Sequence, residues 1–259
     1  MKLTIITVNL NNRNGLEKTI TSVLSQTYKE FEYIVIDGGS TDGSIEIISQ
    51  NAAALSDWVS EPDSGIYHAM NKGIAMSKST YVLFLNSGDV LLDKNTLGNV
   101  VPRLHSVDII YGDLRIIHKE KYEDHLYPEK LTFSYFIQKS LGHPASFIKR
   151  SLFDDVGLYD ENMIICADWA FFIRAIGLFK ATYQHIPVTV AIFNTDGISC
   201  LPKNRLIMRE EKMNLLKNDF SFFETDYESY LDLKDNVEAL RRSKPYKFLK
   251  LLGLPKYQS

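Results

Sequence analysis

The sequence lacks the marks of a secreted or membrane-spanning protein. Its 259 residues include two cysteines, Cys166 and Cys200, which are too few for the disulfide framework of a secreted domain. No run of about 18 apolar residues occurs, so no segment is expected to span a bilayer. The N-terminus has no charged lead, long apolar run and small-residue cleavage site in succession. These absences predict a cytoplasmic protein.

The chain also lacks a strong overall charge. Its net charge of −3 argues against a general nucleic-acid binder. Residues 241–256, however, carry six basic side chains and no acid, and the remaining 23 basic and 32 acidic side chains leave −9. A basic tail that is rich in apolar residues predicts peripheral contact with the anionic inner face of a membrane. The alternative is a C-terminal helix packed on the acidic body.

Strand and helix signals alternate along the first hundred residues. β-Branched and apolar runs predict strands at 3–8, 31–36, 57–60 and 81–85. Helical spacing of apolar residues predicts helices at 16–26, 44–50 and 65–76. Later signals predict strands at 107–111, 114–118 and 188–193, and helices at 164–176, 201–217 and 220–235. We therefore expect an α/β domain over residues 1–200, with helices on both faces of a parallel sheet, and a helical extension over 201–259.

Polar clusters follow three of the predicted strands. They are Thr7 to Asn12, Asp37 to Asp42, and Asn86 to Asp89. Each alone suits an ordinary turn, but the ends of parallel strands converge, and three such clusters favour a ligand crevice. Neither G-x-G-x-x-G nor a Walker A loop follows the first strand, so a bound phosphate would need a cation. Asp89 is a candidate ligand for a divalent ion.

The N-terminal half resembles the inverting, family-2 glycosyltransferases of the GT-A fold, a Rossmann-like, mostly parallel mixed sheet flanked by helices. The resemblance is close over residues 3–92 and resumes at 141–145, 157–160 and 167–169. The matching stretches include Ile36-Asp37-Gly38-Gly39-Ser40-Thr41-Asp42, Ser60-Glu61-Pro62-Asp63-Ser64-Gly65-Ile66-Tyr67, Ala69-Met70-Asn71-Lys72-Gly73, Asn86-Ser87-Gly88-Asp89, Gly142-His143-Pro144 and Ala167-Asp168-Trp169. It implies transfer of a sugar from a nucleotide-diphosphate sugar, with a UDP-sugar expected, to a glycan or lipid-linked acceptor in surface-polysaccharide synthesis.

The resemblance also implies residues for the nucleotide. Asp37 would accept a hydrogen bond from the donor's base, and Thr7 would line the same pocket. Asn9, Asn86 and Ser87 belong to the polar clusters at the strand ends and complete the expected nucleotide site.

The remaining implied roles concern the metal and the reacting sugars. Asp89 falls on the last acid of the metal motif and would bind Mn²⁺ or Mg²⁺ bridging the diphosphate. Asp168 falls on the catalytic base, which would take the proton from the acceptor hydroxyl. Trp169 would offer an aromatic face to a sugar. His143 would contact the donor or the acceptor, or else is a structural histidine of a turn.

Departures from the family pattern leave alternatives open. Asn86 stands where the first acid of the metal motif is expected, and Ala167 replaces the Glu of a Glu-Asp pair. A catalytically silent nucleotide-sugar-binding module that assists a partner transferase is therefore the alternative. A sugar nucleotidyltransferase would share the sheet but would need a Gly-rich, Arg-containing loop after the first strand, which is missing.

Overall fold

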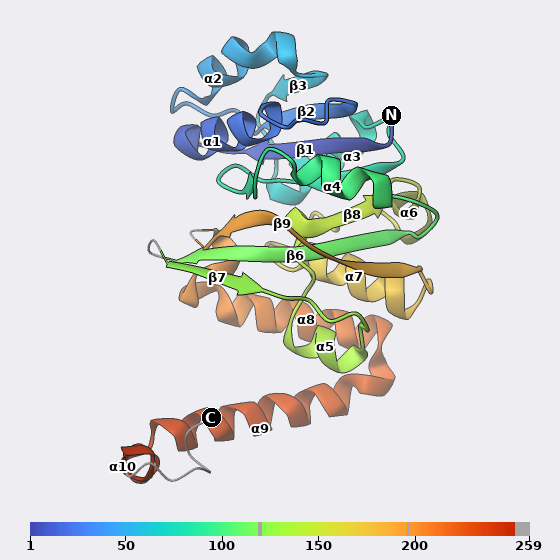
Figure 1. The fold of residues 1–259 in the computed structure, drawn as a ribbon. Coiled ribbons are helices and arrows are strands. Elements are labelled where there is room, and N and C mark those ends of the chain that lie inside the picture. Colours follow the sequence, from blue (N-terminus) through green and yellow to red (C-terminus); the bar gives the residue numbers. More distant parts are fainter. Residues whose placement is uncertain (119–120, 196, 252–259) are drawn as a thin grey trace. The chain divides into compact units, whose positions relative to one another are not determined.

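A nine-stranded mixed sheet forms the centre of the fold (Figure 1). The computed structural model describes residues 1–118, 121–195 and 197–251. The strands follow the order β3-β2-β1-β4-β8-β6-β9-β5, and β7 pairs with β6 outside this path. Their bounds are β1 Leu3–Asn9, β2 Phe31–Asp37, β3 Asp57–Ser60, β4 Tyr81–Phe84, β5 Val90–Leu91, β6 Ile109–His118, β7 Lys121–His125, β8 Ser146–Lys149 and β9 Tyr183–Asn194.

The helices up to residue 177 fall between strands, and those from residue 205 follow the last strand. The early ones are α1 Arg13–Leu24, α2 Ser44–Asn51, α3 Ile66–Met76 and α4 Thr96–Val100. The later ones are α5 Phe133–Gln138, α6 Leu152–Val156, α7 Ala167–Gly177, α8 Arg205–Asp219, α9 Glu224–Arg242 and α10 Lys244–Leu251. The predicted α/β class is confirmed.

The first four strands of the path, β3, β2, β1 and β4, run parallel. In their register Asn9 lies beside Asp37, and Asp37 lies beside Ser60, so three strands end at one level. The chain after β4 continues alongside β1, because Ser87 N donates to Val8 O at 3.1 Å. The polar segments that follow these strands therefore meet at one edge of the sheet, as the sequence predicts.

The other half of the sheet is mixed. β8 is antiparallel to both β4 and β6, while β9 is parallel to β6. Two strands were expected at 107–111 and 114–118, but β6 is one strand whose pairing with β9 shifts around Asp113. The sequence did not indicate β7, β8 or α5, because these elements are short and lie in the aromatic-rich stretch 113–147, which has no clear period.

Helix α3 lies very close to β1. A Cβ added at Gly73 would fall well inside van der Waals distance of Ile6 Cγ2, so glycine is what permits this approach. Beyond it, an aromatic cluster fills the core between β4, α6 and α7, with neighbouring ring centroids 4.5–6.5 Å apart; its members are Phe84, Phe153, Tyr159 and Phe171. Tyr67 of α3 joins it through Tyr159, at 5.7 Å between ring centroids. This packing fixes α3 and α7 under the polar edge.

The chain divides into two compact units, Met1–Glu211 and Lys212–Ser259. The sequence predicts a division at residue 200, and the Glu211 carboxylate accepts hydrogen bonds from the backbone before α7 within the first unit. The second unit is helical over its described residues, with α9 and α10. None of the described helices has the length and apolar character needed to cross a membrane.

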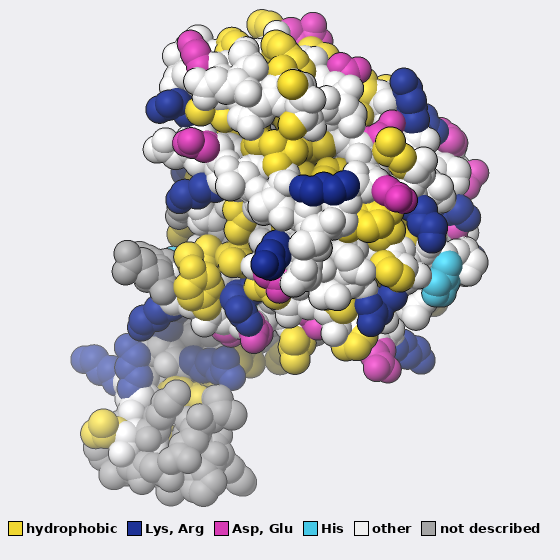
Figure 2. Space-filling view, turned by 45° about the horizontal axis from the view of Figure 1, so that its top comes forward, with side chains coloured by type: hydrophobic (Ala, Val, Ile, Leu, Met, Phe, Trp, Pro, Cys, Tyr) yellow, Lys and Arg dark blue, Asp and Glu magenta, His cyan; other side chains and the backbone are white. Residues whose placement is uncertain are grey.

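Acidic and basic side chains are interspersed on the face of the molecule shown in Figure 2.

Substitution of Gly73 tests the close contact of α3 with β1. Alanine favours an isolated helix by about 1 kcal/mol, yet Gly73→Ala should destabilise the protein by about 1–3 kcal/mol because the new methyl group overpacks against Ile6. Gly98→Ala in α4 is the matched control, since a Cβ there meets only Thr27 Oγ1, at 3.9 Å. Chemical denaturation should show opposite signs for the two variants; equal effects would contradict the close contact.

Candidate functional site

Two adjoining cavities open at the edge where the parallel strands end. The first has a volume of about 190 Å³ and the second of about 520 Å³. Both are lined by Asn12, Ile66, Tyr67, Asn86, Ser87, Gly197 and Ile198. The first cavity alone reaches Asp89, His143 and Asp168. Residues from the ends of β1 and β4, from α3 and from the start of α7 thus share one space.

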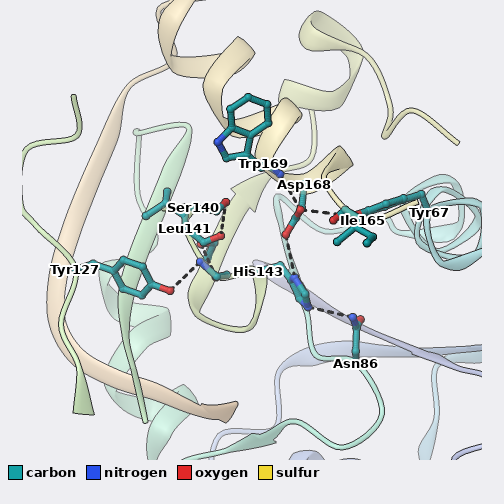
Figure 3. A network of polar contacts seen from close by, with 11 residues as sticks. Tyr67, Asn86, Tyr127, Ser140, Leu141, His143, Ile165, Asp168 and Trp169 are labelled. Atoms are coloured by element: carbon teal, nitrogen blue, oxygen red, sulfur yellow. Dashed lines mark hydrogen bonds and ion pairs between the residues drawn. The ribbon is translucent and has the colours of Figure 1, made fainter. Parts of the chain in front are cut away.

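His143 connects Asp168 to Asn86 across the first cavity (Figure 3). Its Nε2 lies 3.0 Å from Asn86 Nδ2, and its Nδ1 lies 3.5 Å from Asp168 Oδ2. The side chains of His143 and Asp168 are 16% and 20% exposed, so both can meet a ligand. The turn of His143 is held by Tyr127, whose hydroxyl accepts from Gly142 N at 2.9 Å. A single imidazole ring therefore separates Asp168, the predicted base, from Asn86, at the end of the cavity where the diphosphate is expected.

Asp89 is a buried carboxylate on the wall of the same cavity, 5% exposed. Its Oδ1 accepts from Asn194 N at 3.1 Å. Burial raises the pKa of Asp89 to about 6, although nearby His143 and the Asn194 N–H oppose the rise. A divalent cation would offset this cost of burying the charge.

The residues present fit an ion that takes few ligands from the protein. Within the described residues, no group of three or more His, Cys, Asp or Glu side chains could hold a metal. Asn86 Oδ1 is buried and has no hydrogen-bond partner in the described part of the chain, so it can serve as a second oxygen beside Asp89. Oxygen ligands of this kind suit Mg²⁺ or Mn²⁺, with the rest supplied by phosphate and water.

Asp168 is oriented by its neighbours. Its Oδ1 accepts from Trp169 N at 2.8 Å and lies 3.4 Å from the Tyr67 hydroxyl. Tyr67 donates to Ile165 O at 2.5 Å, which ties α3 to the turn before α7. Asp168 Oδ2 is thus the oxygen that faces His143 and the cavity.

Trp169 does not offer a face to a sugar, so this prediction is wrong. Its side chain is 1% exposed, and the indole Nε1 donates to Phe136 O at 2.8 Å. Figure 3 shows the ring directed away from His143 and Asn86. Asp168 and Trp169 are successive helical residues and point in different directions, so only the acid reaches the cavity.

Asp37 does not face either cavity, which corrects its expected contact with a base. It is fully buried, and its two oxygens accept from Asn9 Nδ2, Ser40 Oγ, Ser40 N, Gly39 N and Ser60 Oγ at 2.6–3.2 Å. These hydrogen bonds lower its pKa even though burial, the largest single influence, acts to raise it. Thr7 is also fully buried, with its hydroxyl 3.1 Å from that of Tyr33, so it does not line the pocket.

The second cavity contains an acid that the sequence analysis did not select. Asp63 lines it together with Asn9 and Leu10. One Asp63 oxygen accepts from Gly65 N at 3.0 Å, and the other lies beside Gly38, where a Cβ would meet it at 2.5 Å. Asn9 Oδ1 is buried without a hydrogen-bond partner among the described residues. The Asp63 carboxylate and Asn9 Oδ1 can both act as hydrogen-bond acceptors, so the cavity suits a ligand that presents hydrogen-bond donors to them.

Asn9, Asn86, Ser87, Asp89, His143 and Asp168 therefore lie on the two cavities, whereas Thr7, Asp37 and Trp169 do not. Sequence reasoning missed Tyr67 and Asp63 although both stand in stretches that carry the family resemblance. It also missed Glu211, for which the local sequence gave no signal.

Comparison with known proteins identifies the family. The model of "Glycosyl transferase family 2" matches residues 4–174, which include Asn9, Asn86, Asp89, His143 and Asp168. The chain belongs to this family. It is accordingly a glycosyltransferase, an enzyme that transfers a sugar.

Bacterial relatives support the assignment. The chain is 30% identical over 200 residues to a PGL/p-HBAD biosynthesis glycosyltransferase of Mycobacterium tuberculosis, covering 74% of this chain and 77% of that one. It is 32% identical over 208 residues to an uncharacterized glycosyltransferase of the same organism, covering 76% of each.

Solved structures show that the fold is GT-A like. The mannosyltransferase PcManGT from Pyrobaculum calidifontis, in complex with GDP-Man and Mn²⁺, matches with a TM-score of 0.67 and 17% identity over 99% of this chain and 82% of that one. S. aureus TarS 1–349 in complex with UDP-GlcNAc matches with a TM-score of 0.63 and 18% identity over 76% of this chain. The match spans 59% of that TarS chain.

The placement of Asp37 predicts a role in stability. Asp37→Asn should cost about 1.5–3 kcal/mol at neutral pH, because the amide cannot accept all the hydrogen bonds of the carboxylate. A lowered folded-state pKa gives stability that is present above the unfolded pKa and is lost as pH falls through the folded one. The difference between wild type and variant, measured by denaturation, should therefore shrink in acid; a difference that stays constant to low pH would contradict this role.

Proposed function

We propose that the protein transfers a sugar, with inversion, from a UDP-sugar or another nucleotide-diphosphate sugar to a hydroxyl of a glycan or lipid-linked acceptor. The observation that carries the proposal is the first cavity, in which His143 lies between Asp168 and Asn86, and which Asp89 also lines. A base at one end and a diphosphate site at the other are what a direct displacement at the anomeric carbon requires. The acceptor hydroxyl attacks from the side opposite the leaving group.

Asp168 is the proposed general base. Its Oδ2 takes the proton of the acceptor hydroxyl while the oxygen forms the new bond to the anomeric carbon. The bond from that carbon to the diphosphate breaks, and the nucleoside diphosphate leaves with the electron pair. Trp169 N holds Oδ1 at 2.8 Å, so the carboxylate keeps its orientation during the transfer.

Asp89 and Asn86 are the proposed protein ligands of a divalent ion, Mn²⁺ or Mg²⁺. When bound, the ion supplies a positive charge that stabilises the leaving diphosphate. Ser87 lies between the two ligands on the wall of both cavities and is placed to contact the phosphates. His143, 3.0 Å from Asn86 Nδ2, is proposed to contact the donor next to them.

The base of the donor is proposed to occupy the second cavity. Asp63 and Asn9 Oδ1 would accept hydrogen bonds from the base there, and apolar Val8, Leu10 and Ala69 would supply contact area. Uracil offers an N3–H and guanine an N1–H to such acceptors. The UDP-GlcNAc and GDP-Man complexes of the structural neighbours are consistent with either base.

Substitution of each of three carboxylates should therefore impair a different step. Asp168→Asn should lower turnover by about 10²–10⁴-fold and keep donor binding, because it removes only the proton acceptor. Asp89→Asn should abolish the gain in donor affinity on adding Mn²⁺. Asp63→Asn should weaken binding of free UDP even in EDTA, by about 1.5–3 kcal/mol. Calorimetric titration of UDP and UDP-GlcNAc, with transfer and donor hydrolysis assays, separates these effects.

Asp155→Asn is the control, because Asp155 is an exposed acid of α6 that lies on neither cavity. Near-normal turnover of the Asp168→Asn variant would contradict the assignment of Asp168 as the general base. Wild-type protein that binds donor yet neither transfers nor hydrolyses it, with Mn²⁺ present and against a panel of acceptors, would contradict the proposed reaction.

The basic tail bears on where the enzyme meets its acceptor. Helix α10 presents exposed Lys244 and Lys247, and Leu251 is 85% exposed. Leu252, Leu254 and Lys256 of the basic tail lie outside the described residues. We propose that residues 241–256 contact an anionic surface at the cytoplasmic face of a membrane, where a lipid-linked acceptor would be found.

Liposome pelleting tests this contact. Full-length protein should sediment with vesicles of phosphatidylglycerol and phosphatidylcholine at low salt, and it should detach at high salt because the attraction is electrostatic. Protein truncated after Ser243 should remain in the supernatant. Lys244→Glu together with Lys247→Glu should weaken binding without shortening the chain. Full-length protein that ignores anionic vesicles at low salt would show that the tail has another role.

A further inference from the structure

The turn that carries Asp168 depends on a residue far along the chain. Helix α7 begins at Ala167, and its N-cap residue, Cys166, makes no side-chain capping hydrogen bond. The first N–H groups of a helix need partners from outside it. Glu211 of α8 does not bind these groups but accepts from the N–H groups of the three residues just before α7.

One carboxylate accepts three successive backbone N–H groups. Glu211 Oε1 accepts from Ile164 N at 2.5 Å, and Oε2 accepts from Ile165 N at 3.2 Å and from Cys166 N at 2.9 Å. Two oxygens with about four lone-pair sites make a carboxylate the side chain suited to such a set. Its negative charge also interacts favourably with the positive end of the α7 dipole. Glu211 therefore fixes the backbone immediately before the proposed base.

The same turn is held from the opposite side by the donor-site helix. Ile165 O accepts from the Tyr67 hydroxyl of α3 at 2.5 Å, so Ile165 is bound through its N–H by Glu211 and through its C=O by Tyr67. Cys166 Sγ also lies 3.8 Å from Met208 O, one turn before Glu211 on α8. Asp168 follows two residues later, and its Oδ1 is itself 3.4 Å from the Tyr67 hydroxyl. The turn has little freedom to move independently of these two helices.

We infer that Glu211 is a positioning residue for the transfer step, acting through Asp168. This inference rests on the proposed role of Asp168 as the base. Glu211 lies outside residues 4–174, which match the family, so part of the machinery that aligns the base comes from beyond the shared segment. Glu211 itself lines neither cavity and is not expected to touch either substrate.

The test separates turnover from binding. Glu211→Ala should lower kcat by about 10–100-fold, because a small displacement of a reacting group carries a cost of that order. Donor affinity and donor KM should stay within about twofold, since the donor ligands are untouched. Glu211→Gln retains one accepting oxygen and should give an intermediate kcat. Glu210→Ala, a change to the exposed neighbouring acid on α8, should behave as wild type.

A double variant asks whether Glu211 acts through the base. In an Asp168→Asn background, Glu211→Ala should cause no further loss of kcat, because the group being positioned has lost its function. If Glu211→Ala fails to fold, Glu211→Gln in the same two backgrounds carries the test. A full additional loss in the double variant would overturn the inference.

Failure of this inference is distinct from failure of the proposed base. If Asp168→Asn keeps its turnover, the base assignment is wrong whatever Glu211 does. If Asp168→Asn is impaired while Glu211→Ala turns over like Glu210→Ala, the positioning role is wrong and the base stands. If Glu211→Ala and Glu211→Gln both lose donor affinity and thermal stability together with kcat, Glu211 is a structural residue and the inference is overturned.

Discussion

The buried carboxylate of Asp37 is the interaction on which the polar edge of the sheet depends. It gathers Asn9, Ser40 and Ser60, which come from the ends of β1 and β3 and from the loop after β2. An ionised group at 0% exposure is stable only when its oxygens are fully hydrogen-bonded, and here five donors meet that need. The strand ends cannot separate without leaving a charge unpaired. The loops that line the cavities therefore start from strand ends that are held rigidly together.

Two short hydrogen-bonded bridges connect the elements around the proposed donor and acceptor sites. His143 lies between Asn86 at the end of β4 and Asp168 on α7. The Ile165 peptide lies between Tyr67 on α3 and Glu211 on α8. The first bridge ends at Asp168, and the second fixes the backbone three residues before it. If Asp168 is the base, as proposed, this arrangement orients it through the elements that line both cavities.

The sequence predicted the parallel half of the fold well, because β-branched runs and helical spacing are local signals in residues 3–85. It predicted that Asn86, Asp89, His143 and Asp168 share one site, since strand ends converge and the family motifs are specific. It was wrong about Asp37, Thr7 and Trp169, because burial depends on packing that no local pattern reveals. Glu211 could not be predicted, since its partners are backbone N–H groups, which every residue but proline carries.

The single carboxylate of the metal motif has a consequence for how the donor binds. With Asn86 and Gly88 beside Asp89, the protein offers one negative ligand where a pair of acids would offer two. An ion held by one carboxylate and an amide oxygen gains most of its charge stabilisation from the diphosphate. Burial raises the pKa of Asp89 to about 6, so this carboxyl retains a proton more readily than an exposed acid. Both effects favour joint binding of the proposed ion and the proposed nucleotide-sugar donor.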